Sequence, residues 1–154
     1  MVPPAVRIKE RKAMKSIIAR IAARLLTPVL LVLSVIVLFR GHQLPGGGFI
    51  AALLAATGLN YHAIVYDPGK IYRILPAHPA HLMAMGLLFC IMAAAAGFLQ
   101  GRDMLTGLWV EPDVPLLGRV SLGTPLLFDT GIFFIVTGAL VLIFLLLIEE
   151  IEWK

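Results

Sequence analysis

Two long apolar segments meet at residues 39–49, which read FRGHQLPGGGF. Three consecutive glycines in this stretch, residues 46–48, stand at the head of the second apolar segment. Glycine loses more backbone freedom on ordering than any other residue, so a glycine run at this position must be required by its surroundings. Three arrangements would require it: close approach of a neighbouring helix, a sharp return of the chain, or an anion held by exposed N–H groups.

The composition excludes a soluble domain. Of the 154 residues, 60% are hydrophobic and only 14% are charged, and the mean hydropathy is +0.94. These values predict an all-α integral membrane protein. The net charge of +4 comes from Lys and Arg near the ends and in the connectors, which is typical of membrane topology and contact with anionic lipid, and not of nucleic-acid binding. The single cysteine, Cys90, excludes a disulfide framework and a metal site built from cysteines.

Four segments are long and apolar enough to cross about 30 Å of hydrocarbon; they are residues 21–39, 46–66, 81–99 and 125–148. Together they form a predicted four-helix membrane domain, residues 21–148. Residues 1–20 are predicted to be a basic amphipathic helix at the membrane interface, and no cleavage pattern follows them, so we expect them to remain in the mature protein. The connector 100–123 is predicted to contain a small extracytoplasmic β-hairpin-like loop, and residues 149–154 form an acidic C-terminal tail.

The distribution of positive charge predicts the orientation. With four spans, both termini lie on one side, and that side carries ten of the thirteen Lys and Arg residues. The positive-inside rule therefore predicts a multi-pass protein of the cell membrane with cytoplasmic N- and C-termini. The glycine run, the hairpin-like loop and the start of the fourth span then face the outer side.

Small residues line one face of the second predicted span. Gly48, Ala52, Ala56 and Asn60 follow one another at intervals of four residues, so they share a helix face. A partner backbone can approach such a face closely, and the Asn60 amide can then form a hydrogen bond across the contact. This face favours close helix packing over an anion site as the reason for the glycine run.

Asp129 is the candidate functional residue of the membrane domain, because it is the carboxylate within an apolar span, one turn into the fourth helix. A charge at this depth is costly unless it is paired or solvated, which makes it a functional-site candidate. The alternative is structural, since a carboxylate in a first helical turn is stabilised by the helix dipole. His42 is expected on the same side, where it could pair with Asp129, relay a proton or only form a hydrogen bond. Asp129, His42 and Asn60 are thus the candidates for an ion pathway or a polar cluster.

Nothing in the sequence indicates an enzyme or a bound cofactor. His78 and His81 have an H-x-x-H spacing, but Pro79 interrupts it and no third ligand lies nearby, so we expect no metal site. The chain also lacks a nucleophile with its base, a phosphate-binding loop and a dinucleotide-binding fingerprint.

The motifs resemble those of a known family. The run Gly41-His42-Gln43-Leu44-Pro45-Gly46-Gly47-Gly48-Phe49 resembles the G-H-N-x-P-G-G-G-F signature of the MnhB subunit of the Mrp, or Mnh, multisubunit sodium/proton antiporters. Residues 115–118, PLLG, and 127–131, LFDTG, resemble two further segments of that family. The resemblance covers about residues 25–148. Gln43 departs from the family's Asn, and the basic N-terminal extension is not shared.

The resemblance implies an integral subunit of a larger membrane complex that exchanges Na⁺ for H⁺, with other subunits and membrane lipid as partners. It also implies a contribution of Asp129 and His42 to ion passage or to assembly. Similar domains occur in membrane-bound hydrogenases related to respiratory complex I, so a scaffold subunit of such a redox complex is the alternative.

Overall fold

The computed structural model describes residues 4–41, 47–66, 71–110, 113–114, 118–119 and 122–152. The helices are α1 (Pro4–Arg40), α2 (Gly48–Val65), α3 (Ile71–Ile74), α4 (Pro79–Leu99) and α5 (Thr124–Glu152). Four of them contain segments long and apolar enough to cross a membrane, at Ile17–Arg40, Gly48–Val65, Pro79–Leu99 and Thr124–Glu150. The prediction of an all-α membrane protein with four spans is therefore confirmed.

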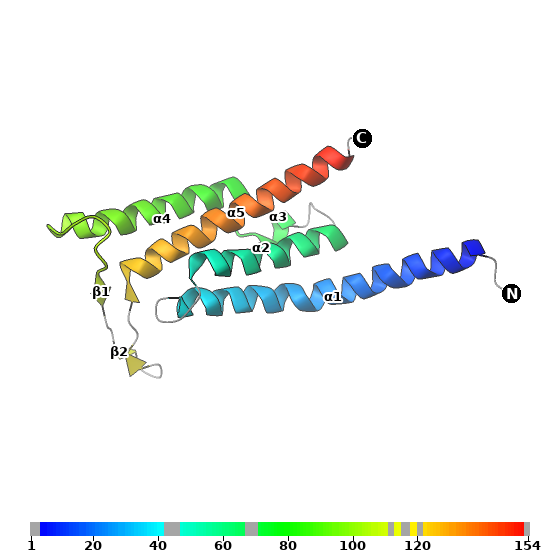
Figure 1. Cartoon of the computed structure of the whole chain (residues 1–154), viewed down its shortest axis with the longest axis horizontal. Helices are drawn as coiled ribbons and strands as arrows, with labels where there is room; N and C mark the ends of the chain where they lie inside the picture. The colour runs from blue at the N-terminus through cyan, green and yellow to red at the C-terminus, as the bar shows by residue number, and fades with distance from the viewer. Residues whose placement is uncertain are drawn as a thin grey trace.

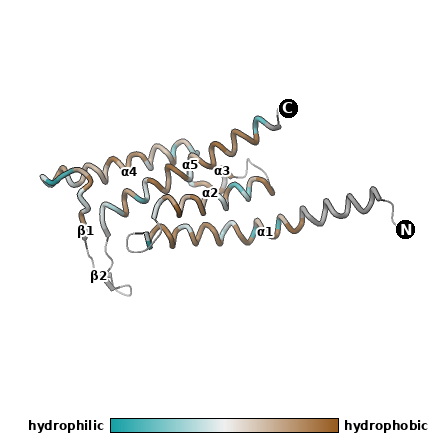
Figure 2. The backbone as a smooth tube through the Cα atoms, in the orientation of Figure 1, coloured by the Kyte–Doolittle hydropathy of each residue, from teal (hydrophilic) through white to brown (hydrophobic). Residues whose placement is uncertain are grey.

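The four long helices lie side by side as two antiparallel pairs (Figure 1). α1 packs on α2, α4 packs on α5, and α2 joins the pairs by packing on α5. Figure 2 shows that hydrophobic residues dominate the described parts of these helices, with hydrophilic residues toward their ends. Many large apolar side chains face outward, as expected where lipid or other subunits cover a helix.

α2 is the most enclosed of the four spans. Its small residues allow this, because alanines on two adjoining faces are almost fully buried; they are Ala51, Ala52, Ala55 and Ala56. The predicted face of Gly48, Ala52 and Ala56 is thus part of a wider small-residue surface between α1 and α5. Further along, Ala63 of α2 joins Ile71 of the short helix α3 and Val141 of α5 in the apolar core.

The helix bounds differ from the predicted spans at several ends. α2 begins at Gly48, with Gly47 as its N-cap. α1 is a single helix through residues 4–40, which joins the predicted interfacial segment to the first span. α5 continues to Glu152, so Glu149 and Glu150 lie in its last turns. The membrane-surface position of residues 1–20 stays a prediction.

Short strands occupy the connector before α5. β1 (Trp109–Val110) pairs antiparallel with β4 (Leu122–Gly123), and β2 (Asp113–Val114) pairs antiparallel with β3 (Gly118–Arg119). Residues 111–112, 115–117 and 120–121 lie outside the described part of the chain. A continuous hairpin therefore stays a prediction.

Candidate functional site

The start of α2 lies directly against Asp129 of α5. A Cβ atom added to Gly48 would overlap the backbone carbonyl oxygen of Asp129, and one added to Gly47 would lie 3.4 Å from its carboxylate Oδ2. Only a residue without a side chain fits at Gly48, because the obstacle is backbone and cannot turn away. Close approach of a neighbouring helix, the packing interpretation favoured by the sequence, therefore accounts for the glycine at position 48.

Gly47 satisfies a second requirement. It is the N-cap of α2, with φ at 97°, a left-handed conformation that L side chains rarely adopt. Its carbonyl oxygen accepts the hydrogen bond from the Ala51 N–H, at 3.1 Å. Gly47 thus combines this backbone conformation with its position beside the carboxylate of Asp129.

The N-terminal end of α2 lies beside Asp129. The first N–H groups of a helix have no partner within the helix, and the helix dipole places partial positive charge there. The Asp129 carboxylate lies at this end of α2, beside Gly47 and Gly48. The helix start therefore supplies part of the compensation that a carboxylate within an apolar span requires.

Asp129 also borders a hollow of about 200 Å³ between the ends of α4 and α5. The hollow is lined by Ala93, Leu105, Thr124, Pro125, Phe128 and Asp129. Its volume is enough for several water molecules, each of which takes about 30 Å³ in the liquid. Because Asp129 is the charged group in this lining, water or a cation entering the hollow would meet a carboxylate.

The loop after α4 forms one wall of the hollow. Its backbone folds back onto the end of that helix, where the Leu105 N–H donates to the Ala94 carbonyl at 3.2 Å. Leu105 has a φ of 65°, so the loop holds a leucine in a left-handed conformation that costs about 1–2 kcal/mol. Thr124 and Leu108 then close the loop on the start of α5, with the Leu108 N–H donating to the Thr124 hydroxyl at 3.1 Å.

The predicted site residues divide into three groups. His42, Pro45 and Gly46 lie outside the described residues. Gly47 and Gly48 meet Asp129. The third group lies away from this contact and comprises Gly41 at the end of α1, the outward-facing Phe49, the buried Ala52 and Ala56, and Asn60.

Asn60 lies at the other end of the seam between α2 and α5. Its Nδ2 donates to the Leu140 carbonyl at 3.5 Å, so the amide bonds across a helix contact as the sequence predicted. It is twelve residues beyond Gly48, or about 18 Å along the helix. Asn60 and Asp129 are therefore not members of one polar cluster.

A further set of glycines was not identified from the sequence as one contact. Gly131 and Gly138 of α5 cross α4 at Gly86 and Pro79. A Cβ on Gly131 would lie 2.6 Å from the Gly86 carbonyl oxygen, and one on Gly138 would lie 2.7 Å from the Pro79 carbonyl oxygen. The sequence signal for this contact was a shared spacing: the contact residues lie seven positions apart on each of the two helices.

Histidine and acidic residues do not form a metal site in the described part of the chain. His78 is the N-cap of α4, where its Nδ1 accepts the Ala80 N–H at 3.3 Å. Its ring lies 5.8 Å from that of His81, edge to face. His78 of the H-x-x-H pair thus caps the start of a helix.

A family model agrees with this arrangement. The domain related to the MnhB subunit of Na⁺/H⁺ antiporters matches residues 18–142. The chain belongs to the MnhB family. The resemblance read from the glycine motif is thereby confirmed.

Individual relatives of this MnhB chain are named as antiporter subunits. The Na(+)/H(+) antiporter B subunit of Alkalihalophilus pseudofirmus is 35% identical over 127 residues, which cover 82% of this chain and 88% of the relative. Its Bacillus subtilis counterpart is 28% identical, over 79% of this chain and 85% of the relative. A probable K(+)/H(+) antiporter A/B subunit of Rhizobium meliloti is 31% identical over 86% of this chain and 13% of that longer protein.

A solved structure shares the fold. The Mrp complex from Dietzia sp. DQ12-45-1b matches with a TM-score of 0.69 and 30% identity, over 84% of this chain. The match covers 14% of the solved chain, so an MnhB-like fold forms one part of a longer polypeptide there. The MnhB chain described here is thus a multi-pass membrane protein with the fold of a component of a multisubunit complex.

Proposed function

We propose that this protein is a membrane subunit of a multisubunit monovalent cation/proton antiporter, in which it contributes to assembly and to the ion pathway. The main structural support for this proposal is the contact between the start of α2 and Asp129. Relatives that cover most of this chain are named as subunits of Na⁺/H⁺ antiporters. A transporter subunit, not a classical enzyme, is the function that these names support.

The role proposed for Asp129 is to attract a cation or to exchange a proton at the mouth of a pathway. Its support is the combination of a half-buried carboxylate, a hollow large enough for water and the close approach of the start of α2. Ion pathways in membranes are lined by several polar groups, so neighbouring subunits supply the rest of the path. His42 is proposed as a proton donor or acceptor at the same end.

The orientation that we propose has both termini in the cytoplasm. It rests on the positive-inside rule, since basic residues gather in the N-terminal segment and in the connector around Lys70 and Arg73. Asp129 and the glycine contact would then lie toward the outer surface of the cell membrane, where external protons enter an antiporter that exports Na⁺.

Replacing Asp129 with Asn tests this role, because the amide keeps the shape of the side chain and removes its charge. We expect the assembled complex to form and the exchange of Na⁺ or K⁺ for H⁺ in membrane vesicles to fall by roughly tenfold or more. A pH-sensitive dye measures the exchange, and co-purification of the other subunits measures assembly.

Asp103→Asn is the matched control, since Asp103 is an exposed carboxylate in the loop after α4. We expect it to leave exchange unchanged. Full exchange by an assembled Asp129→Asn complex would reject an ion role for Asp129. Loss of assembly in that variant would assign the carboxylate to packing.

A further inference from the structure

We propose that Asp129 takes up and releases protons at the hollow beside it and does not bind Na⁺ or K⁺. Asp129 then serves the proton side of the exchange, so this assignment rests on the proposed function. It selects one of the two roles, attraction of a cation or exchange of a proton, that the proposed function leaves open.

The hollow beside Asp129 offers few oxygen ligands to a cation. A monovalent cation that leaves water needs several oxygen atoms in place of its hydration shell. In the described part of the chain, the polar side chains that line the hollow are those of Asp129 and Thr124. The Thr124 hydroxyl already accepts the Leu108 N–H, at 3.1 Å. One carboxylate is enough for a proton, but it cannot replace the water around a metal cation.

The backbone near Asp129 presents N–H groups instead of carbonyl groups. Cation sites in membrane transporters use carbonyl oxygens of unwound segments or of the C-terminal ends of helices. Here two helices begin near the carboxylate. α2 starts at Gly48, which lies against the Asp129 backbone, and α5 starts at Thr124. Helix starts carry free N–H groups and partial positive charge, which opposes the binding of a metal cation between them.

The C-terminal end of α4 brings carbonyl groups to the wall of the hollow, and the loop that follows uses them. The Ala94 carbonyl accepts the Leu105 N–H at 3.2 Å. The Gly97 carbonyl accepts two N–H groups, from Gln100 at 3.0 Å and from Arg102 at 3.1 Å. These carbonyl oxygens therefore close the loop onto the helix and are not free to surround a cation.

A proton requires only an acceptor and water. The hollow has a volume of about 200 Å³, which admits several water molecules. The elements packed around Asp129 bring few titratable groups to it: α2 contributes residues 47–48, and α4 contributes Cys90, whose thiol donates to the Phe128 carbonyl at 3.7 Å. His42 lies outside the described residues. Within those residues, Asp129 is the acidic group that a proton in the hollow meets.

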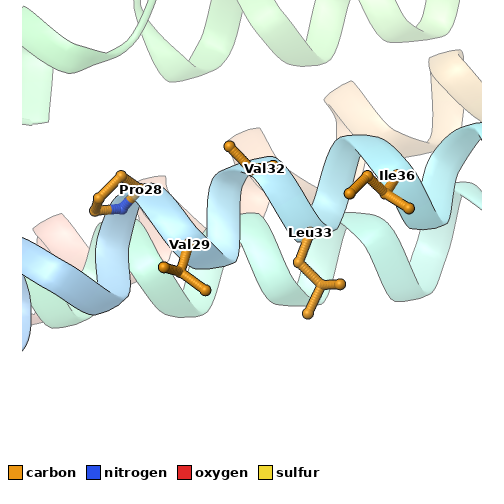
Figure 3. Close-up of a pocket in the computed structure, with 5 residues that line it drawn as sticks. All are labelled: Pro28, Val29, Val32, Leu33 and Ile36. Carbon is orange, nitrogen blue, oxygen red and sulfur yellow. The ribbon is translucent and has the colours of Figure 1, made fainter.

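A larger hollow on α1 differs in kind. It has a volume of about 380 Å³ and is lined by Pro28, Val29, Val32, Leu33 and Ile36 (Figure 3). All five side chains are apolar, so this surface offers neither a proton acceptor nor a cation ligand. Of the two hollows, the one at Asp129 is the one that can exchange a proton.

Labelling with dicyclohexylcarbodiimide tests the proposal. This reagent reacts with protonated carboxyl groups in apolar surroundings, and a cation bound to the carboxylate blocks the reaction. The assembled complex is purified in mild detergent and labelled at several pH values, and peptide mass spectrometry locates the product. We expect the label at Asp129 to increase as the pH falls. At constant pH and ionic strength, replacing choline chloride with NaCl or KCl should change the rate of labelling by less than about twofold.

Two controls accompany the labelling. The label on the peptide that contains Asp129 should disappear in Asp129→Asn, which assigns the product to this residue. Asp103 is an exposed carboxylate in the loop after α4 of the same chain. Its label should be equal in NaCl, KCl and choline chloride, so any general effect of the salts on the reagent is detected there.

Asp129→Glu provides a second measurement, because it keeps the carboxyl group and moves it by one methylene group. We expect the pH dependence of exchange in membrane vesicles to change, while the KM for Na⁺ or K⁺ stays within about twofold of the wild-type value. A residue that only packs would leave the pH dependence unchanged, and a residue that binds the cation would change the KM.

Two labelling results would overturn the proposal. Protection of Asp129 by NaCl or KCl, but not by choline chloride, would make Asp129 a cation ligand and leave the proposed function intact. Absence of label at every pH would mean that protons do not reach the carboxyl group. Full exchange by an assembled Asp129→Asn complex is a different result, because it would reject the ion role itself.

Discussion

The contacts of α5 differ from the contact between α1 and α2. α5 meets its neighbours backbone to backbone, through Gly48 of α2 and Gly86 of α4, and no Cβ atom fits at either crossing. α1 meets α2 through side chains: the Thr27 hydroxyl donates to the Gly58 carbonyl at 3.2 Å, and a Cβ on Gly58 would lie 3.2 Å from the Leu30 Cβ.

This difference assigns different roles to the helices. In a bilayer, association of helices depends on close packing and hydrogen bonds, because lipid is as apolar as the side chains. α5 is held tightly on two sides, so its residue Asp129 has a fixed position. α1 packs on α2 on one side through side chains and presents the other side to its surroundings.

The largest effect on stability is expected from Gly48→Ala. The added methyl group would overlap the Asp129 carbonyl oxygen, and a backbone obstacle cannot rotate away, so α2 and α5 must separate. We expect a loss of about 3 kcal/mol or more and little recovery of the subunit in the complex. Co-purification with the other subunits and the thermal unfolding of what is recovered measure the effect.

A smaller but clear effect is expected from Gly131→Ala. Its Cβ would lie 2.5 Å from the Cys90 Sγ and 2.6 Å from the Gly86 carbonyl oxygen. The sulfur can move but the carbonyl cannot, so α4 and α5 must shift slightly apart at about 1–3 kcal/mol. Thermal unfolding in detergent tests this, and Cys90→Ala combined with Gly131→Ala should restore only part of the loss. Full restoration would mean that the sulfur alone limits the space.

The smallest effect is expected from Gly58→Ala, the same change on the same helix but at the contact with α1. The methyl group would need a shift of a few tenths of an ångström by Leu30. Alanine also has the higher helix propensity, by about 1 kcal/mol, which offsets the crowding. Thermal unfolding should therefore change little. An effect as large as that of Gly48→Ala would mean that α2 has no more room for a methyl group at its contact with α1 than at its contact with α5.

Periodicity and hydropathy predicted much of this fold, because a membrane span must be long and apolar. The Gly48–Ala52–Ala56 spacing predicted a packing surface, and these three residues are buried on α2. Asp129 was identified as a candidate because placing a charged carboxylate in an apolar segment costs free energy. The contact of Asp129 with Gly48 needed the structure, because the sequence gives no register between two helices that are 81 positions apart.

Other features depend on tertiary structure alone. The crossing of Gly131 with Gly86 joins two helices whose small residues looked independent in the sequence. The separation of Asn60 from Asp129 follows from the length of α2, and the left-handed Leu105 is set by the return of the loop onto α4. The proximity of His42 to Asp129 stays a prediction, since residues 42–46 lie outside the described part of the chain.

The central claim is that the start of α2 rests directly on the Asp129 backbone. An electron cryo-microscopy structure of the assembled complex, at a resolution that separates backbone carbonyls, measures this contact directly. We predict that Gly48 lies against the Asp129 carbonyl with no room for a Cβ atom and nothing between α2 and α5 at that level. A side chain, a lipid or a helix of another subunit inserted between Gly48 and Asp129 would contradict the account.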